Sequence, residues 1–355
     1  MKSPYALLRS LFIGLGASAL LLLAPRMALA DDNLSLVLAK RTPTLMNTLN
    51  LVADGAGFYK DEQLTISRIT VAGALEAAQT CASGAGDICP IGIEPLITNY
   101  PDGIHLKMFL SRASRFAYVI AVPEASPIKS LADFKGKRIG VHVITAAASG
   151  VFTTASALSA AGLKPNEYTF EAIGYENEAA KAMTSGQVAG AAFPVYEFIP
   201  FIVAGMKFRF FRHPTFASVS NVGYAAAPTV LAAKHDAIGR FSRAIVKASL
   251  YIRYNPAAAA RLLLKASGEP FSEDDVRRKT AELTAWEDDL PAADPANKRI
   301  GALSVTALQG YVQLLADAGV AKVAIPSSEI ATEEFVAFAN DFDHEQVKKR
   351  AMSQR

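Results

Sequence analysis

The chain has 355 residues, long enough for two domains, and its 51% hydrophobic and 19% charged residues are typical of a globular protein. It contains 36 Lys and Arg residues against 33 Asp and Glu residues, which gives a formal net charge of only +3. A charge balance this close to neutrality does not indicate a nucleic acid partner, which would favour a strongly basic protein.

The first 30 residues have the features of a secretory signal peptide. Lys2 and Arg9 flank the start of an apolar run over residues 11–23, and Ala28-Leu29-Ala30 matches the small-residue pattern of a cleavage site. The run is too short to cross a bilayer, and no later run reaches the ~18 apolar residues of a membrane span. We therefore expect cleavage after Ala30 and a soluble mature protein with 33 basic and 33 acidic residues, because only Lys2, Arg9 and Arg26 are charged in the removed segment.

Residues 34–110 alternate between two kinds of predicted element. Apolar, alternating segments predict strands over residues 34–39, 64–71, 87–91 and 106–110. Helical patterns bounded by glycine or polar residues predict helices over residues 45–56, 73–81 and 94–100. Strands that alternate with helices indicate a mostly parallel sheet covered by helices on both faces.

A second copy of this unit follows. Residues 56–65 align with residues 161–170, since both contain a helix end, a glycine, a polar turn and a strand. Residues 82–84 align with residues 184–186, where a Ser-Gly turn closes the next helix. The first strand of the second copy is expected over residues 138–143, followed by a helix from Thr145 to Gly162. The chain therefore contains two related α/β units.

Two apolar strands, over residues 116–122 and about 224–233, are expected to connect the units as a two-stranded hinge. Later helices are expected to pack on the first unit, with a loose polar tail after Asp343. The predicted helices cover residues 237–254, 256–266, 272–286, 303–318 and 332–340. The predicted parts are a signal peptide over 1–30, lobe one over 31–115 and 223–355, and lobe two over 116–222.

Four segments of the sequence resemble a known family. They are GFYKDEQL, SPIKSLADFKGKRIGV, AGLKPNEY and GYENEAAKAMTSGQV. The chain resembles, over roughly residues 34–265, the periplasmic solute-binding proteins of nitrate, sulfonate and taurine ABC transporters, a superfamily shared with the thiamine-pyrimidine synthases. The resemblance implies a two-lobed periplasmic binding protein fold, a ligand in the interlobe cleft, hinge closure and delivery to an ABC permease at the inner membrane.

The sequence departs from this family at one turn. The family carries an Asp in both Ser-Gly turns, as at Asp87, but Ala189 occupies the second position. We expect the Asp to cap the turn backbone, so that its replacement weakens one local hydrogen bond.

Ligand-binding residues are expected in loops at the carboxyl ends of the strands, where α/β proteins bind ligands. The candidates are Thr42, Thr44, Asn47, Gly73, Ala74, Ile93 and Glu94 in lobe one, Arg115 beside the hinge, and Thr145, Ala146, Ser149, Tyr175, Pro194 and Tyr196 in lobe two. Helix N-termini beginning at Gly73 and Thr145 would face each other, and their free N–H groups would suit a sulfonate, carboxylate or nitrate.

Several candidates have a second interpretation. Glu94 would favour an amine, as in a taurine-like zwitterion, or it could interact with the dipole of its own helix. Arg115 could pair with an anion or form a surface ion pair. Tyr175 and Tyr196 could wall the cleft or lie at the edge of the core.

No catalytic or metal-binding motif emerges. The five histidines are scattered, and Ser126-Pro127-Ile128-Lys129 lacks the companion motifs of an S-x-x-K enzyme. Cys81 and Cys89 could form a disulfide or remain two buried apolar residues. We expect no enzyme activity and no cofactor.

The sequence therefore predicts a periplasmic binding component of an ABC importer, a monomer that captures a small organic anion such as a sulfonate or carboxylate. Alternatives are a pyrimidine-like or aromatic nutrient, a ligand-presenting partner of a membrane sensor, and a thiamine-pyrimidine-synthase-like enzyme. The signal peptide and the lack of a cysteine-rich segment oppose the last of these.

Overall fold

The computed structural model describes residues 32–39, 47–144, 148–174, 176–217, 219–268, 270–286, 290, 299–317 and 319–354. All of these belong to the unit Asp31–Arg355. The predicted signal peptide lies outside the described residues. Within them, no helix has both the length and the apolar character needed to cross a membrane.

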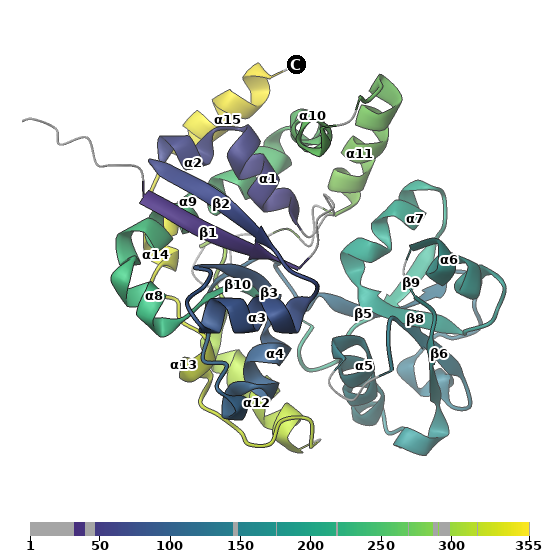
Figure 1. Cartoon of the computed structure of the whole chain (residues 1–355). Coiled ribbons are helices and arrows are strands. Elements are labelled where there is room, and N and C mark those ends of the chain that lie inside the picture. Colours follow the sequence, from purple (N-terminus) through teal and green to yellow (C-terminus); the bar gives the residue numbers. More distant parts are fainter. Residues whose placement is uncertain are drawn as a thin grey trace, which may run out of the picture. The chain divides into compact units, whose positions relative to one another are not determined.

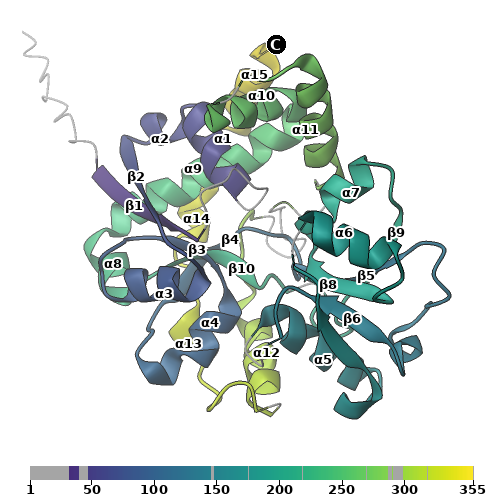
Figure 2. The same ribbon diagram turned by 45° about the vertical axis from the view of Figure 1, so that its right-hand side comes forward.

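The first sheet combines two strand ladders (Figures 1 and 2). Its strands are β1 Asp32–Leu38, β2 Leu64–Thr70, β3 Cys89–Gly92, β4 Lys107–Ser111 and β10 Val222–Ala226. β1 and β2 pair in parallel, β10 pairs antiparallel with β3 and β4, and an isolated parallel bridge between Leu36 and Ile88 joins the ladders. The resulting order is β2-β1-β3-β10-β4.

The second sheet has the corresponding order, β7-β6-β8-β5-β9. Its strands are β5 Tyr118–Pro123, β6 Arg138–Val141, β7 Thr169–Ala172, β8 Gly190–Pro194 and β9 Phe208–Phe211. β6 runs parallel to β7 and β8, and only β5 runs antiparallel to its neighbours. Each sheet thus contains one antiparallel strand, β10 or β5, in the same place. This confirms the predicted fold class, with its repeated, mostly parallel α/β units.

Strand alternation explains how the second sheet is covered on both sides. Val119 and Ala121 of β5 pack in one apolar cluster with residues of α6 Glu176–Thr184. Ile120 and Val122 point the other way and pack in a separate cluster with Leu158 of α5 Ser149–Ala160. Figure 1 shows α5 on one side of this sheet and α6 with α7 Ile199–Val203 on the other. The two-residue period of the strand therefore supplies both faces of the layered structure.

Helices of the first sheet and of the C-terminal part complete the fold. Those within residues 48–98 are α1 Thr48–Gly55, α2 Phe58–Asp61, α3 Ala74–Ala82 and α4 Ile93–Thr98. Those that follow β10 are α8 Pro228–Ala233, α9 His235–Tyr254, α10 Pro256–Ser267, α11 Glu273–Ala285, α12 Val305–Asp317, α13 Ser327–Ile330, α14 Val336–Ala339 and α15 His344–Ser353. The long α9 contributes Phe241 and Ile245 to the core that also holds Leu34 and Leu36 of β1.

Two expectations about secondary structure are wrong. The strand predicted over about 224–233 ends at Ala226, because Pro228 begins α8 at a helix start, where its missing N–H costs nothing. The tail after Asp343 is not loose but forms α15, with the Asp343 side chain accepting a hydrogen bond from Glu345 N at 2.9 Å. Arg350 ties this helix to the body by donating to Ala56 O at 3.1 Å.

The Asp in the first Ser-Gly turn also behaves differently from the prediction. Asp87 Oδ2 accepts hydrogen bonds from the backbone N and the hydroxyl of Ser35, at 2.8 and 2.9 Å, and Oδ1 lies 2.8 Å from Lys234 Nζ. Burial acts to raise the pKa of Asp87, but these bonds hold it below its ordinary value. At the equivalent position, Ala189 N donates to Arg138 O at 2.8 Å. The second unit thus has a backbone hydrogen bond at this position but lacks the contacts that the Asp87 carboxylate makes with Ser35 and Lys234 in the first unit.

The two cysteines meet in the core between α3 and β3. Cys81 and Cys89 are both free and buried, and the Cys89 thiol donates to Ala225 O at 3.6 Å. The structure therefore agrees with the interpretation as buried apolar residues.

Candidate functional site

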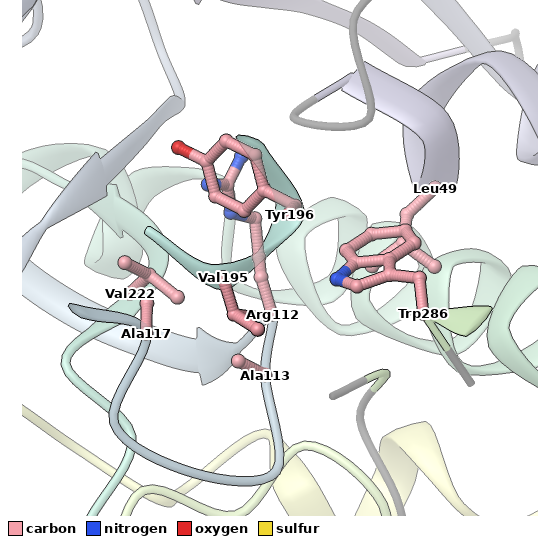
Figure 3. Close-up of a pocket in the computed structure, with 8 residues that line it drawn as sticks. All are labelled: Leu49, Arg112, Ala113, Ala117, Val195, Tyr196, Val222 and Trp286. Carbon is pink, nitrogen blue, oxygen red and sulfur yellow. The ribbon is translucent and has the colours of Figure 1, made fainter. Parts of the chain in front are cut away.

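A pocket lies where the chain leaves β4 and β8 and enters β5 and β10 (Figure 3). Its lining residues are Leu49, Arg112, Ala113, Ala117, Val195, Tyr196, Val222 and Trp286. Its empty volume is about 380 Å³ when the part open to solvent is included.

The topology explains why these residues come together. Arg112 and Ala113 directly follow β4, and Val195 and Tyr196 directly follow β8. The parallel strands of each sheet end at one edge, where ligands bind in open α/β sheets. Because β10 runs antiparallel to β4, its first residue, Val222, lies at this same edge.

The polar side chains of the pocket are all able to donate hydrogen bonds. Arg112 is only 7% exposed, and its guanidinium carbon lies 5.8 Å from the centroid of the Tyr224 ring. Tyr196 contributes a hydroxyl, and the indole nitrogen of Trp286 points into the pocket in Figure 3. No acidic side chain is among the described residues that line it. This arrangement suits a ligand with hydrogen-bond acceptors and negative charge.

The rest of the lining is apolar and well packed. Ala113, Ala117 and Val222 form a small buried cluster, and their short side chains leave the space empty. Leu49 and Trp286 belong to the main core of the first sheet, so packing fixes the position of this wall.

A buried carboxyl network lies beside the pocket. Glu94 is 2% exposed, and its Oε1 accepts hydrogen bonds from Asn221 Nδ2 at 2.6 Å and from the Tyr311 hydroxyl at 2.9 Å. The second carboxylate oxygen of Glu94, Oε2, is buried and has no hydrogen-bond partner among the described residues. Asn221 Oδ1 accepts from Ala117 N at 2.9 Å, which connects this network to the pocket wall. Burial raises the pKa of Glu94, against the lowering effect of these hydrogen bonds.

The structure places the predicted ligand residues in different surroundings. Tyr196 lines the pocket, Glu94 lies in the network, and Ser149 is the first residue of α5. The other described candidates are buried or distributed around the edges of the sheets, outside the pocket lining: Asn47, Gly73, Ala74, Ile93, Arg115 and Pro194. Candidates that lie outside the described residues are Thr42, Thr44, Thr145, Ala146 and Tyr175. Their role in ligand binding stays a prediction, as does that of the other candidates.

Sequence reasoning missed Arg112 and Trp286. Arg112 carries a usable signal, because it is the second residue after the strand predicted over 106–110, but Arg115 in the same loop is the residue predicted from the sequence. Trp286 follows α11, far along the chain, and nothing in its local sequence indicates that it reaches the pocket.

Known proteins share this fold. No curated protein sequence matches the chain. The periplasmic aliphatic sulphonate binding protein SsuA from Escherichia coli is similar with a TM-score of 0.62 and 18% identity, covering 84% of this chain and 91% of that one. The alkanesulfonate-binding protein SsuA from Xanthomonas axonopodis pv. citri, bound to MOPS, has a TM-score of 0.61 and 17% identity, covering 85% and 98%.

A desulfurization enzyme, DszB, is also similar, with a TM-score of 0.54 and 16% identity over 87% of this chain and 98% of that chain. At these identities the likeness establishes the fold alone, and the fold serves both binding proteins and an enzyme. A family model gives the closer assignment. It matches residues 47–259, more than half of the chain, and the chain therefore belongs to the NMT1/THI5 like family.

Proposed function

We propose that this protein is the periplasmic substrate-binding component of an ABC importer and that it captures a small organic anion in the pocket around Arg112. The observation that carries the proposal is the lining itself, in which Arg112, Tyr196 and Trp286 offer donors and no described side chain is acidic. The signal-peptide pattern at the N-terminus and the fold shared with the two SsuA proteins support export and a transport role.

The proposed mechanism uses the two lobes assigned from the sequence, 31–115 with 223–355 and 116–222. The anion enters the open cleft and pairs with the Arg112 guanidinium, while Tyr196 approaches from the other lobe. The connections through β5 and β10 bend, and closure excludes water, which strengthens the ion pair. The closed form then docks on the permease.

An enzyme is the second candidate, because DszB shares the fold. The described lining of the pocket contains no Ser, Cys, His, Asp or Glu side chain, so it offers no common nucleophile or general base. This composition favours binding over catalysis.

A thermal-shift screen against sulfonates, carboxylates and neutral heterocycles tests the proposal. A ligand at 100 times its dissociation constant stabilises the folded state by about 2.7 kcal/mol. We expect organic anions to raise the melting temperature of the wild type, with the effect lost in Arg112→Gln and reduced in Arg112→Lys. Arg68→Gln is the matched control, because Arg68 pairs with Asp54 on the exposed surface, away from the pocket. Shifts from neutral heterocycles alone would refute the anion proposal.

A further inference from the structure

The short helix α7 has two apolar faces, and each belongs to a different core. All five residues of α7 are apolar. Phe198, its N-cap residue, and Phe201 lie three positions apart and pack in the apolar cluster of the second sheet. Ile199 and Val203 lie four positions apart and pack in the main core of the first sheet, and Ile202 packs against both clusters. A helix that only covered its own sheet would bury a single face.

The partner of the second face is α11, a helix of the C-terminal part. α7 packs against α11, and the two helices lie next to each other in Figures 1 and 2. Ile199 is 2% exposed and shares its apolar cluster with Leu283 of α11 and with Trp286, which follows α11. This contact therefore joins residues 116–222 to the C-terminal helices at a place separate from the two crossings of the chain.

The contact lies beside the pocket and sets the distance between two of its walls. Val195 and Tyr196 line the pocket and come just before α7. Trp286 also lines it and directly follows α11. Figure 3 shows Tyr196 and Trp286 on different sides of the pocket. A movement of α7 away from α11 would therefore separate these two walls and open the pocket.

The contact needs no ligand to form. It buries aliphatic and aromatic side chains, and the gain from removing such surface from water is available whether the pocket is filled or empty. In an open form, Ile199 and the residues that it meets at α11 would be exposed to water. Apolar burial therefore favours the arrangement seen in the structure for the free protein as well.

We propose that α7 and α11 form an apolar latch, with Ile199 on one side and the cluster residues Leu283 and Trp286 on the other, that holds the pocket shut in the protein without ligand. Opening of the latch then precedes ligand entry, and the free protein populates the open form only as a minor state. This inference rests on the hinge closure in the proposed function and adds the contact that keeps the two lobes together.

Two spin labels measure the separation of the lobes in the absence of any ligand. Lys181 of α6 and Lys265 of α10 are exposed, and both are replaced by cysteine for labelling. The native Cys81 and Cys89 are buried, so they do not compete for the label in the folded protein. Double electron–electron resonance on the purified mature protein then gives the distribution of distances between the labels. We expect one dominant distance when the latch is intact.

Two substitutions of Ile199 weaken the latch to different degrees. Ile199→Ala removes most of the buried side chain, and Ile199→Asn also places an amide against the apolar wall of α11. We expect a longer label distance to increase at least about tenfold relative to the closed form in Ile199→Ala. The longer distance should become the dominant one in Ile199→Asn.

Ile173→Ala is the matched control, because it removes the same atoms from a buried isoleucine that packs in the cluster of the second sheet. It should lower the melting temperature and leave the distance distribution unchanged. Thermal unfolding shows whether each variant folds, and Ile199→Ala carries the test if Ile199→Asn does not fold.

The outcomes separate the latch from the proposed function. Unchanged distances in the folded Ile199 variants would overturn the latch, as would a longer distance that already dominates without these substitutions. An equal change in Ile173→Ala would overturn it as well, because the effect would then come from a general softening of the fold. None of these results refutes the proposed function, which the thermal-shift screen tests with ligands present. A screen in which no organic anion stabilises the protein refutes that function and leaves the measured distances unaffected.

Discussion

Replacing Glu94 by glutamine would test how burial affects the carboxyl at the centre of the network beside the pocket. The Glu94 side chain is 2% exposed, and both described donors to it, Asn221 Nδ2 and the Tyr311 hydroxyl, use Oε1. Glutamine keeps this acceptor oxygen and has nearly the same shape. The substitution therefore removes the ability to ionise and preserves the two hydrogen bonds.

The sign of the effect follows from the direction of the pKa shift. Burial raises the pKa of Glu94 above its ordinary value of 4.5. The folded state therefore holds this proton to higher pH than the unfolded state, and the associated stability is lost as pH rises from 4.5 through the raised pKa. Each unit by which the pKa is raised corresponds to about 1.4 kcal/mol. We expect Glu94→Gln to match the wild type near about pH 4 and to be more stable than the wild type near about pH 8.

Glu62 is a second buried carboxyl, and its pKa is shifted in the opposite direction from that of Glu94. It accepts from Arg243 at 2.7 Å and from Lys247 at 2.5 Å, and although burial acts to raise its pKa, these cations hold the pKa below its ordinary value. Its stability contribution is present above 4.5 and is lost as pH falls through the lowered pKa. Glu62→Gln leaves two cations without their shared partner, so we expect a loss of about 3 kcal/mol at neutral pH that shrinks under acid conditions.

Urea unfolding of the three proteins across this pH range measures the free energies. We expect the unfolding free energy of the variant minus that of the wild type to become more positive with rising pH for Glu94→Gln. For Glu62→Gln we expect it to become more negative. A pH-independent difference for Glu94→Gln would show that the native carboxyl titrates like an unfolded one, and the argument from burial would be wrong.

Three further predictions concern other parts of the fold. Burial lowers the pKa of His213 to about 4, so its NMR titration should have a midpoint near 4, and stability should fall by about 2 to 3 kcal/mol as pH drops from 6.5 to about 4. An unperturbed midpoint near 6.5 would contradict this. Ala117→Leu should fill the pocket and weaken ligand binding at least tenfold in calorimetry, at a stability cost of about 1 to 3 kcal/mol. Unchanged affinity would show that the ligand binds elsewhere. Truncation after Asp343 removes the buried Val347 and Ala351 and should lower the melting temperature, whereas a loose tail would leave it unchanged.

Much of the fold could be predicted because its signals are local. Glycine turns, capping residues and alternating strands lie within a few residues of one another, and the repeat revealed two units of the same type. The C-terminal α15 was not predicted, because Val347 and Ala351 are its only described buried residues. A helix held mainly by polar contacts, such as Arg350 to Ala56 O, has too few apolar positions to show a helical pattern.

The site was less predictable because its residues come from distant segments. Strand ends indicated the correct edge of each sheet and led to Tyr196. Which arginine of the loop after β4 lines the pocket depends on the path of the backbone, since only two residues separate Arg112 from Arg115. Trp286 reaches the pocket only through the packing of α11 near α7 and α10, which is a tertiary effect.

The position of the pocket connects ligand contact with the connections between the two sheets. The segment from β4 to β5 carries Arg112, Ala113 and Ala117, so the proposed anion contact lies on one of the two crossings itself. Ser111 Oγ donates to Ser220 Oγ at 2.7 Å, joining this crossing to the other one, next to Val222. In the proposed mechanism, an anion that pulls on Arg112 therefore acts directly on the segments that must bend, and closure follows from contact with the hinge as well as from contact with the lobes.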